Sequence, residues 1–152
     1  KGPFEYRIVW DNVIYQPGEL KVVAYKNGKR WAADVVKTTG PAAKLVLKAD
    51  RKKIAADGKD LSYVTLTVED KNGLMVPQAD NLIHFKIVGV GEIVATDNGD
   101  ATDLTSFPSP DRKAFNGLAL AIVRGKAGES GSIQLTAQAD GLTPATIKIE
   151  SQ

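Results

Sequence analysis

The sequence predicts an all-β fold, an immunoglobulin-like β-sandwich preceded by a small antiparallel sheet, and two observations carry this prediction. In the segment 61–69 apolar and polar residues alternate strictly, as expected of a strand with one buried face. The turn pairs Asp57-Gly58 and Asn72-Gly73 bound that segment, and similar pairs separate most other apolar segments. The apolar set of the segment is Val64, Leu66 and Val68.

Nine segments follow this pattern of a short apolar strand between polar turns. The expected strands are 20–26, 31–36, 45–49, 61–69, 82–88, 93–96, 118–123, 133–139 and 145–149. A further strand is expected around 6–10. The segment 112–123 is the best helical candidate, but it contains Asn116-Gly117 and then alternates, so we expect a loop followed by a strand.

A domain boundary is expected at 38–43, where TTGPAA combines Gly and Pro without charge. Residues 44–152 hold seven of the nine expected strands, within the ~100 residues that an immunoglobulin-like sandwich needs. Residues 1–40 are too short for a second sandwich, so we expect them to be the C-terminal strands of a truncated preceding β-sandwich domain. The chain begins at Lys1 and not at methionine, which favours a fragment of a longer polypeptide.

Truncation of that first sheet predicts an uncovered apolar face, which another domain or a second copy of the chain would cover. The residues expected on this face are Val22, Ala24, Trp31, Ala33 and Val35. The sequence therefore predicts self-association through the N-terminal sheet, in which the partner is a second copy of the chain.

Composition narrows the function classes. The chain has 152 residues, 20 basic and 18 acidic, so its formal charge of +2 is too small to favour nucleic acid as a partner. No apolar run reaches the ~20 residues that span a bilayer, so no membrane partner is expected. The chain has no cysteine, which excludes disulfides and thiolate metal sites within it.

Short signatures follow one another in a fixed order along almost the whole chain. The first is the run 17–25, followed by Asn27-Gly28-Lys29. The later ones are Ala49-Asp50-Arg51, the run 54–61, Val68-Glu69-Asp70, Val76-Pro77, Gly89-Val90-Gly91, Asp97-Asn98-Gly99 and the run 112–117. Together they resemble the C-terminal region of bacterial β-galactosidases of glycoside hydrolase family 2. The first signature resembles the end of an accessory β-sandwich domain that follows the catalytic barrel in those enzymes, and the later ones resemble the domain after it.

The resemblance implies a non-catalytic accessory region, with a scaffold or interaction role, of a β-galactosidase-like enzyme that acts on carbohydrate. Enzymes of this family use two glutamates on a (β/α)₈ barrel of ~250 residues, and this chain has no such barrel. We therefore expect no catalytic residue and no cofactor. The resemblance also implies that the remaining domains of the same polypeptide are partners and that the enzyme is periplasmic or secreted.

Two candidate sites for ligands emerge from side-chain chemistry. One long loop carries the carboxylates of Asp97, Asp100 and Asp103, with Asp111 nearby. Carboxylates gathered in this way predict a site for a hard cation such as calcium. The simpler alternative is a solvated loop without a cation. We expect Phe107 and Phe115 to hold this loop, 97–116, against the core. His84, the only histidine, alternates against apolar neighbours and is expected on the surface.

Tyr63 is the clearest outward aromatic residue of the expected strands and is the candidate for carbohydrate stacking. It supports an alternative function, that of a carbohydrate-binding module. A further alternative reads the Ala-Asp-Gly and Glu-Asp-Lys-Asn-Gly motifs as those of an invasin-like immunoglobulin repeat in a surface adhesin. That alternative predicts tandem copies of one unit, and the segments 20–40 and 44–141 do not repeat each other.

Overall fold

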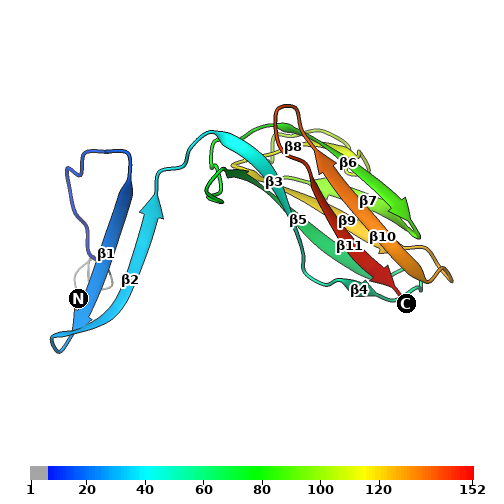
Figure 1. The fold of residues 1–152 in the computed structure, drawn as a ribbon, viewed down its shortest axis with the longest axis horizontal. Coiled ribbons are helices and arrows are strands. Elements are labelled where there is room, and N and C mark those ends of the chain that lie inside the picture. Colours follow the sequence, from blue (N-terminus) through cyan, green and yellow to red (C-terminus); the bar gives the residue numbers. More distant parts are fainter. Residues whose placement is uncertain (1–6) are drawn as a thin grey trace. The chain divides into compact units, whose positions relative to one another are not determined.

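The computed structural model describes residues 7–152, which form eleven β-strands and no helix (Figure 1). The all-β prediction is therefore confirmed. Within this range no helix is long and apolar enough to cross a membrane. The chain divides into two compact units, Lys1–Thr38 and Thr39–Gln152. Each unit is described by itself below.

The first unit is a two-stranded antiparallel sheet of β1 (Glu19–Lys26) and β2 (Lys29–Lys37). Asn27 and Gly28 form the connecting turn with φ of 52° and 74°, as a two-residue hairpin turn of type I′ requires. The preceding segment is tied to the end of β2, because the Gly18 N–H donates to the Thr38 hydroxyl at 3.1 Å. Of the strand expected at 6–10, Tyr6 lies outside the described residues, and 7–10 form no strand.

The cross-strand register of this sheet corrects the expected apolar face. Val23 lies opposite Ala33, and Ala24 lies opposite Ala32, so Ala33 and Ala24 point to opposite faces. The prediction of one face carrying Val22, Ala24, Trp31, Ala33 and Val35 was therefore wrong. Alternation within a strand does not reveal the register between strands, and a bulge between Ala24 and Tyr25 shifts that register further.

Both faces of the two-stranded sheet carry exposed apolar side chains. Leu20 pairs with Val36 on one face, and each is 65% exposed. Trp31 is 72% exposed, and the Lys26 ammonium lies 5.5 Å from the centre of its ring. This unit therefore has no apolar core of its own among the described residues, as expected for two strands alone.

The second unit is a sandwich of two sheets (Figure 1). One sheet has four strands in the order β3-β5-β9-β7, and the other has five in the order β4-β11-β10-β6-β8. The strands of the first sheet are β3 (Ala42–Ala49), β5 (Leu61–Asp70), β9 (Leu118–Gly125) and β7 (Gly91–Asp97). Those of the second are β4 (Lys53–Ile54), β11 (Ala145–Ser151), β10 (Gly131–Gln138), β6 (Leu82–Gly89) and β8 (Asp111–Lys113).

This strand order is that of an immunoglobulin-like sandwich. Its four-stranded sheet corresponds to strands A, B, E and D, and β6, β10 and β11 of the other sheet correspond to C, F and G. All pairings are antiparallel except that of β11 with the short β4. The first and last strands of the sandwich, β3 and β11, therefore belong to different sheets.

The core lies between the two sheets. The β5 side chains predicted to point inward are fully buried, and they meet large residues of the opposite sheet in one cluster. These side chains are Val64, Leu66 and Val68 from β5 and Ile83, Ile133, Leu135 and Ile149 from the opposite sheet. Packing is close enough that β7 must begin with glycine, because Ile133 Cδ1 lies 2.7 Å from where a Cβ of Gly91 would sit.

All nine expected strands are present, and β4 and β8 are additional. Strands of two and three residues are too short to show a period, so local alternation could not reveal them. At the start of the sandwich, the carboxylate of Asp70 accepts hydrogen bonds from the main-chain N–H groups of Gly40, Asn72 and Leu74. This buried side chain joins the segment before β3 to the turn after β5.

Candidate functional site

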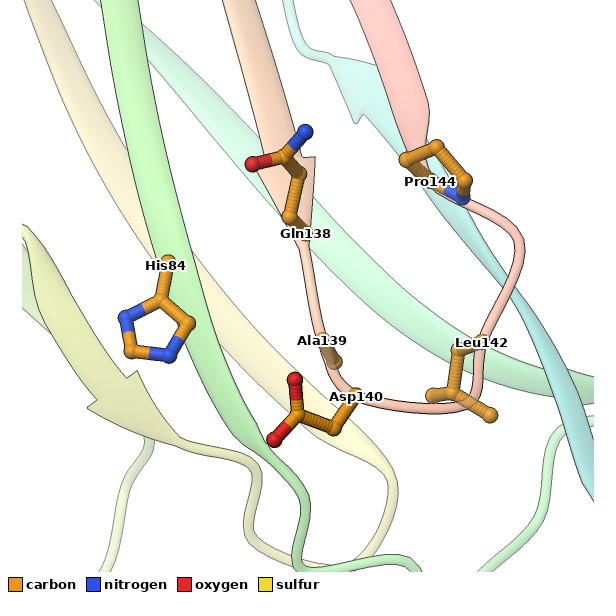
Figure 2. A pocket seen from close by; sticks show the side chains of 6 residues that line it. All are labelled: His84, Gln138, Ala139, Asp140, Leu142 and Pro144. Carbon is orange, nitrogen blue, oxygen red and sulfur yellow. The ribbon is translucent and has the colours of Figure 1, made fainter.

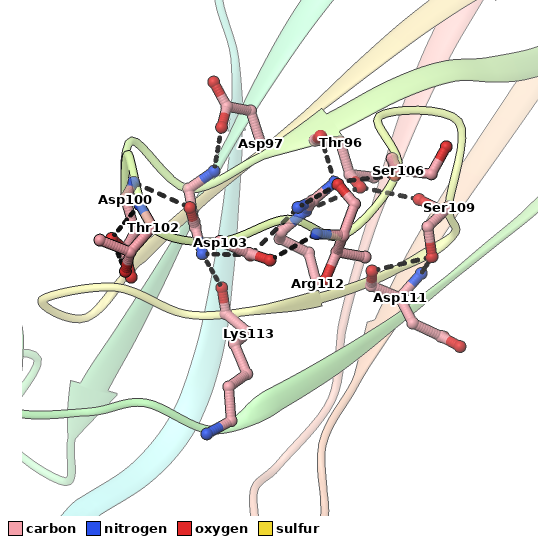
Figure 3. Close-up of polar contacts among 12 residues, drawn as sticks. Thr96, Asp97, Asp100, Thr102, Asp103, Ser106, Ser109, Asp111, Arg112 and Lys113 are labelled. Carbon is pink, nitrogen blue, oxygen red and sulfur yellow. Dashed lines mark hydrogen bonds and ion pairs between the residues drawn. The ribbon is translucent and has the colours of Figure 1, made fainter.

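The long loop 98–110, between β7 and β8, is organised around one buried arginine (Figure 3). Arg112 comes from β8, where its neighbours Asp111 and Lys113 pair with His84 and Leu82 of β6. Alternation along β8 directs Arg112 to the inner side of the sheet, and the residue is only 2% exposed. A charged side chain is therefore placed at one end of the apolar core.

All five N–H donors of the Arg112 guanidinium are used. Nε donates to Thr96 Oγ1 at 3.2 Å, and Nη2 donates to the carbonyls of Thr96 and Ser106 at 2.9 and 3.0 Å. Nη1 donates to Asp103 Oδ2 at 3.0 Å and to the Thr105 carbonyl at 3.1 Å. Because an arginine has five such donors, the buried charge is both paired and completely hydrogen-bonded.

The partner carboxylate, Asp103, is also enclosed by its own loop. Its side chain is 15% exposed, its Oδ1 accepts from the Thr105 N–H at 2.9 Å, and its Oδ2 accepts from the Asn98 amide at 2.9 Å. Hydrogen bonds from Thr105 and from Arg112 hold the pKa of this carboxyl far below its usual range. The pair is therefore charged at neutral pH, and it fixes both ends of the loop.

The expectation that Phe107 and Phe115 hold this loop was wrong, because their side chains are 62% and 40% exposed. The main chain and Arg112 hold it instead, with the Thr96 N–H donating to the Phe107 carbonyl at 2.7 Å. Sequence reasoning missed Arg112. The available signal was its place two residues before Ala114, which is buried, and between the two outward charged residues Asp111 and Lys113.

The four carboxylates of the predicted cation site serve separate local purposes. Asp97 accepts from the N–H groups of the Asn98-Gly99 turn, and Asp100 accepts from the N–H and hydroxyl of Thr102. Asp111 binds His84, and Asp103 binds Arg112. Among residues 7–152 no three His, Asp or Glu side chains come close enough to hold a metal ion. A cation at Asp97, Asp100 and Asp103 stays a prediction.

His84 is exposed on β6, and its Nδ1 lies 2.8 Å from Asp111 Oδ1. It borders an open pocket beside the turn between β10 and β11 (Figure 2). Figure 2 shows the His84 imidazole on β6 and the Asp140 carboxylate on the turn that follows β10. The remaining lining residues are Gln138, Ala139, Leu142 and Pro144. The pocket thus combines a few polar groups with an aliphatic wall, and none of its described lining residues is Ser, Thr, Cys or Lys.

Tyr63 lies on the outer side of β5, where it is 41% exposed and faces Ile122 of β9 across the strand pair. Its outward neighbours in that pair are Thr65 and Leu120, so no second aromatic ring extends the surface there. Carbohydrate stacking on Tyr63 stays a prediction.

Comparison with known proteins connects this architecture to a family. The family model described as glycoside hydrolase family 2 C-terminal domain 5 matches residues 45–148, which contain nearly the whole sandwich. The chain belongs to this family. A second family model, described as a domain of unknown function, matches residues 2–32.

Relatives of this C-terminal domain are much longer proteins. The chain is 39% identical over 145 residues to the β-galactosidase BoGH2A of Bacteroides ovatus, and the match covers 95% of the chain but 17% of that protein. A solved glycosyl hydrolase family 2 member from Bacteroides cellulosilyticus superposes with a TM-score of 0.88 at 36% identity, over 92% of this chain and 18% of that one. A solved β-glycosidase from Bacteroides vulgatus superposes with a TM-score of 0.85 at 26% identity. That match covers 91% of this chain and 18% of the β-glycosidase. The predicted resemblance is confirmed.

Most glutamates of the described residues lie on strands and form ion pairs. Four of the five in the described range form ion pairs with a lysine or arginine, and Glu129 lies in the turn between β9 and β10. Glu5 lies outside the described residues. The pairs are Glu19–Lys37, Glu69–Lys44, Glu92–Arg124 and Glu150–Lys53.

Proposed function

We propose that this chain is a non-catalytic accessory region of a longer, β-galactosidase-like glycoside hydrolase of family 2. In this proposal residues 1–40 supply the last strands of a preceding β-sandwich domain, and residues 44–152 form the immunoglobulin-like domain that follows it. The observation that carries the proposal is that 95% of the chain matches only 17% of a β-galactosidase. The role is that of a scaffold that contacts the remaining domains.

The chemistry of the described side chains supports a non-catalytic role. Retaining glycosidases need two carboxyl groups ~5–5.5 Å apart that flank the glycosidic bond. Here the glutamates on strands face lysine or arginine across short ion pairs, for example Glu92 and Arg124 at 2.7 Å. These ion pairs lie on the surfaces of strands, whereas the general acid of a glycosidase has a raised pKa and lies in a cleft beside the glycosidic bond.

Activity measurements on three proteins test this proposal. The 152-residue chain, the longer polypeptide encoded by its reading frame, and that polypeptide without residues 39–152 are assayed with an aryl β-galactoside. We expect turnover by the longer polypeptide and none by the chain alone. The deletion variant should retain the chemical step and unfold at a lower temperature, because it loses a packed domain.

Hydrolysis by the 152-residue chain would contradict the proposal, and so would a reading frame that encodes no catalytic barrel. A reading frame of serial immunoglobulin-like units would favour the adhesin alternative. Binding of a soluble polysaccharide to the chain, abolished by Tyr63→Ala, would favour the carbohydrate-binding alternative.

A further inference from the structure

The two outer faces of the sandwich have different chemistry. Outward side chains of β6, β10 and β11 are mostly polar, and two exposed apolar residues, Leu82 and Val88, interrupt them. The polar set includes His84, Lys86, Gln134, Thr136, Thr146 and Lys148, identified by their alternation with buried neighbours. Such a face is typical of a sheet with one side in water.

The outer face of the four-stranded sheet carries more apolar residues. We define the apolar face by six outward residues: Val46, Tyr63, Ala95, Leu118, Leu120 and Ile122. Lys48, Thr65, Thr67 and Asp97 lie among them on the same side of the sheet. Leu118 and Tyr63 are 39% and 41% exposed, and the other four are partly buried.

Strand β9 is apolar on its outer side as well as its inner side, and its larger side chains point away from the core. Its inward residues Ala119 and Ala121 are buried, whereas Leu120 and Ile122 alternate with them on the outer side. A strand that is apolar on both sides is typical of a sheet covered on both faces. Removing the remaining accessible apolar area of Leu118, Leu120 and Ile122 from water would stabilise a contact by roughly 25 cal/mol per Å².

Charged residues on this side of the sheet are of both signs, and Lys48 and Asp97 lie on its two edge strands, β3 and β7. Lys44 and Glu69 lie 3.5 Å apart at one end, and Arg124 and Glu92 lie 2.7 Å apart at the other. A surface that packs here needs no opposite net charge. An apolar centre within a polar rim is the usual arrangement of a protein interface.

The size of the face indicates which partner covers it. Four strands ~4.8 Å apart and about seven residues long, at ~3.4 Å per residue, present a projected area of roughly 450 Å². A stable complex of separate proteins buries about 800 Å² per partner, whereas contacts between domains of one chain begin near 600 Å² in total. A face of this size suits a tethered domain, which has a high effective concentration, better than a stable homodimer.

The relatives provide such a tethered partner, since more than four fifths of the Bacteroides ovatus β-galactosidase lies outside the matched segment. We propose that the apolar face is the docking surface for another domain of the same polypeptide, one that lies outside residues 1–152. This inference rests on the proposed function, because it requires the longer enzyme. It assigns the contact to β9 and β5 and leaves the polar face in water.

Thiol labelling tests the assignment. Thr65 lies at the centre of the apolar face between Lys48 and Leu120, and Thr146 lies on the polar face; both are exposed in this chain. Because the chain has no cysteine, Thr65→Cys and Thr146→Cys introduce single thiols in matched residues. Labelling by a maleimide is followed by mass spectrometry of peptides, both in the 152-residue chain and in the longer polypeptide.

We expect both positions to react at similar rates in the 152-residue chain. In the longer polypeptide, position 65 should react at least about tenfold more slowly, since it is reached only by transient opening of the contact, and position 146 should be unchanged. Adding Ile122→Lys should restore the rate at position 65, whereas Val88→Lys on the polar face should not.

Equal rates at the two positions in the longer polypeptide would overturn the inference. Protection that appears in the 152-residue chain, rises with protein concentration and accompanies a dimer in light scattering would also overturn it, in favour of a second copy. Glycoside hydrolysis by the longer polypeptide is measured separately. Activity without protection at position 65 rejects the docking surface alone, and a polypeptide without a catalytic barrel rejects the proposed function.

Discussion

An arginine pairs with a carboxylate both at the loop end of the sandwich and on its four-stranded sheet, but the first pair is buried and the second is exposed. Arg112 and Asp103 have side chains only 1% and 15% exposed, and the guanidinium makes five hydrogen bonds. Arg124 and Glu92 are 39% and 48% exposed, and both guanidinium contacts reach one carboxylate oxygen. Burial makes the first pair necessary for the loop, because its loss would leave charged and polar groups without water.

Among the substitutions below, replacement of Arg112 should lower the free energy of unfolding most. Arg112→Ala removes the cationic partner of the Asp103 carboxylate and the hydrogen bonds from Arg112 to three main-chain carbonyls, so we expect the free energy of unfolding to fall by about 3–5 kcal/mol. Urea unfolding followed by far-ultraviolet circular dichroism measures this. Tryptophan fluorescence would not report on the sandwich, because Trp10 and Trp31 both lie in the first unit.

Arg112→Lys serves as the control for charge. A lysine keeps the positive charge but cannot reach five acceptors as a planar fork does, so an intermediate loss is expected. A loss below about 1 kcal/mol for Arg112→Ala would show that the buried network does not hold this end of the sandwich.

Asp103→Asn should have a smaller effect that depends on pH. The pKa of Asp103 is lower in the folded chain than in the unfolded chain, so its contribution to stability is present above the unfolded pKa of about 4 and is lost as the pH falls below it. We expect the stability of the wild-type chain to fall between about pH 5 and pH 3, and that of the variant to fall less steeply. Urea midpoints across this range measure the difference.

The variant should retain part of the acid dependence. Hydrogen bonds from the main-chain N–H groups of Gly40 and Leu74 also lower the pKa of Asp70, which stays in place in Asp103→Asn. Identical pH profiles for the wild-type chain and the variant would show that Asp103 does not contribute.

Arg124→Ala should have the smallest effect. An exposed ion pair contributes about 0.2–1 kcal/mol, and salt screens it, so we expect a loss of that size or less at low ionic strength and less still at 1 M salt. Thermal unfolding at two salt concentrations measures this. A loss as large as that of Arg112→Ala would remove the contrast between the buried and the exposed pair.

Several parts of this molecule could be predicted from local sequence, and others could not. The segment 61–69 was predicted correctly, including its buried residues, because alternation and flanking turns are properties of the backbone and of single side chains. The position of Arg112 was not predicted, because burial of a charge depends on acceptors that lie 6 to 16 residues away in the sequence. The face of the first sheet was predicted wrongly, because register is set between strands.

The amino-acid sequence by itself determined the all-β class, the nine main strands and the resemblance to the C-terminal region of family 2 glycoside hydrolases. Tertiary structure alone decided which side of β9 faces the core, since both of its alternating sets are apolar and either could have been buried. Ala119 and Ala121 point inward because the large side chains of the opposite sheet already fill the space between the sheets. The same choice places Leu120 and Ile122 on the outer face, where the proposed contact forms.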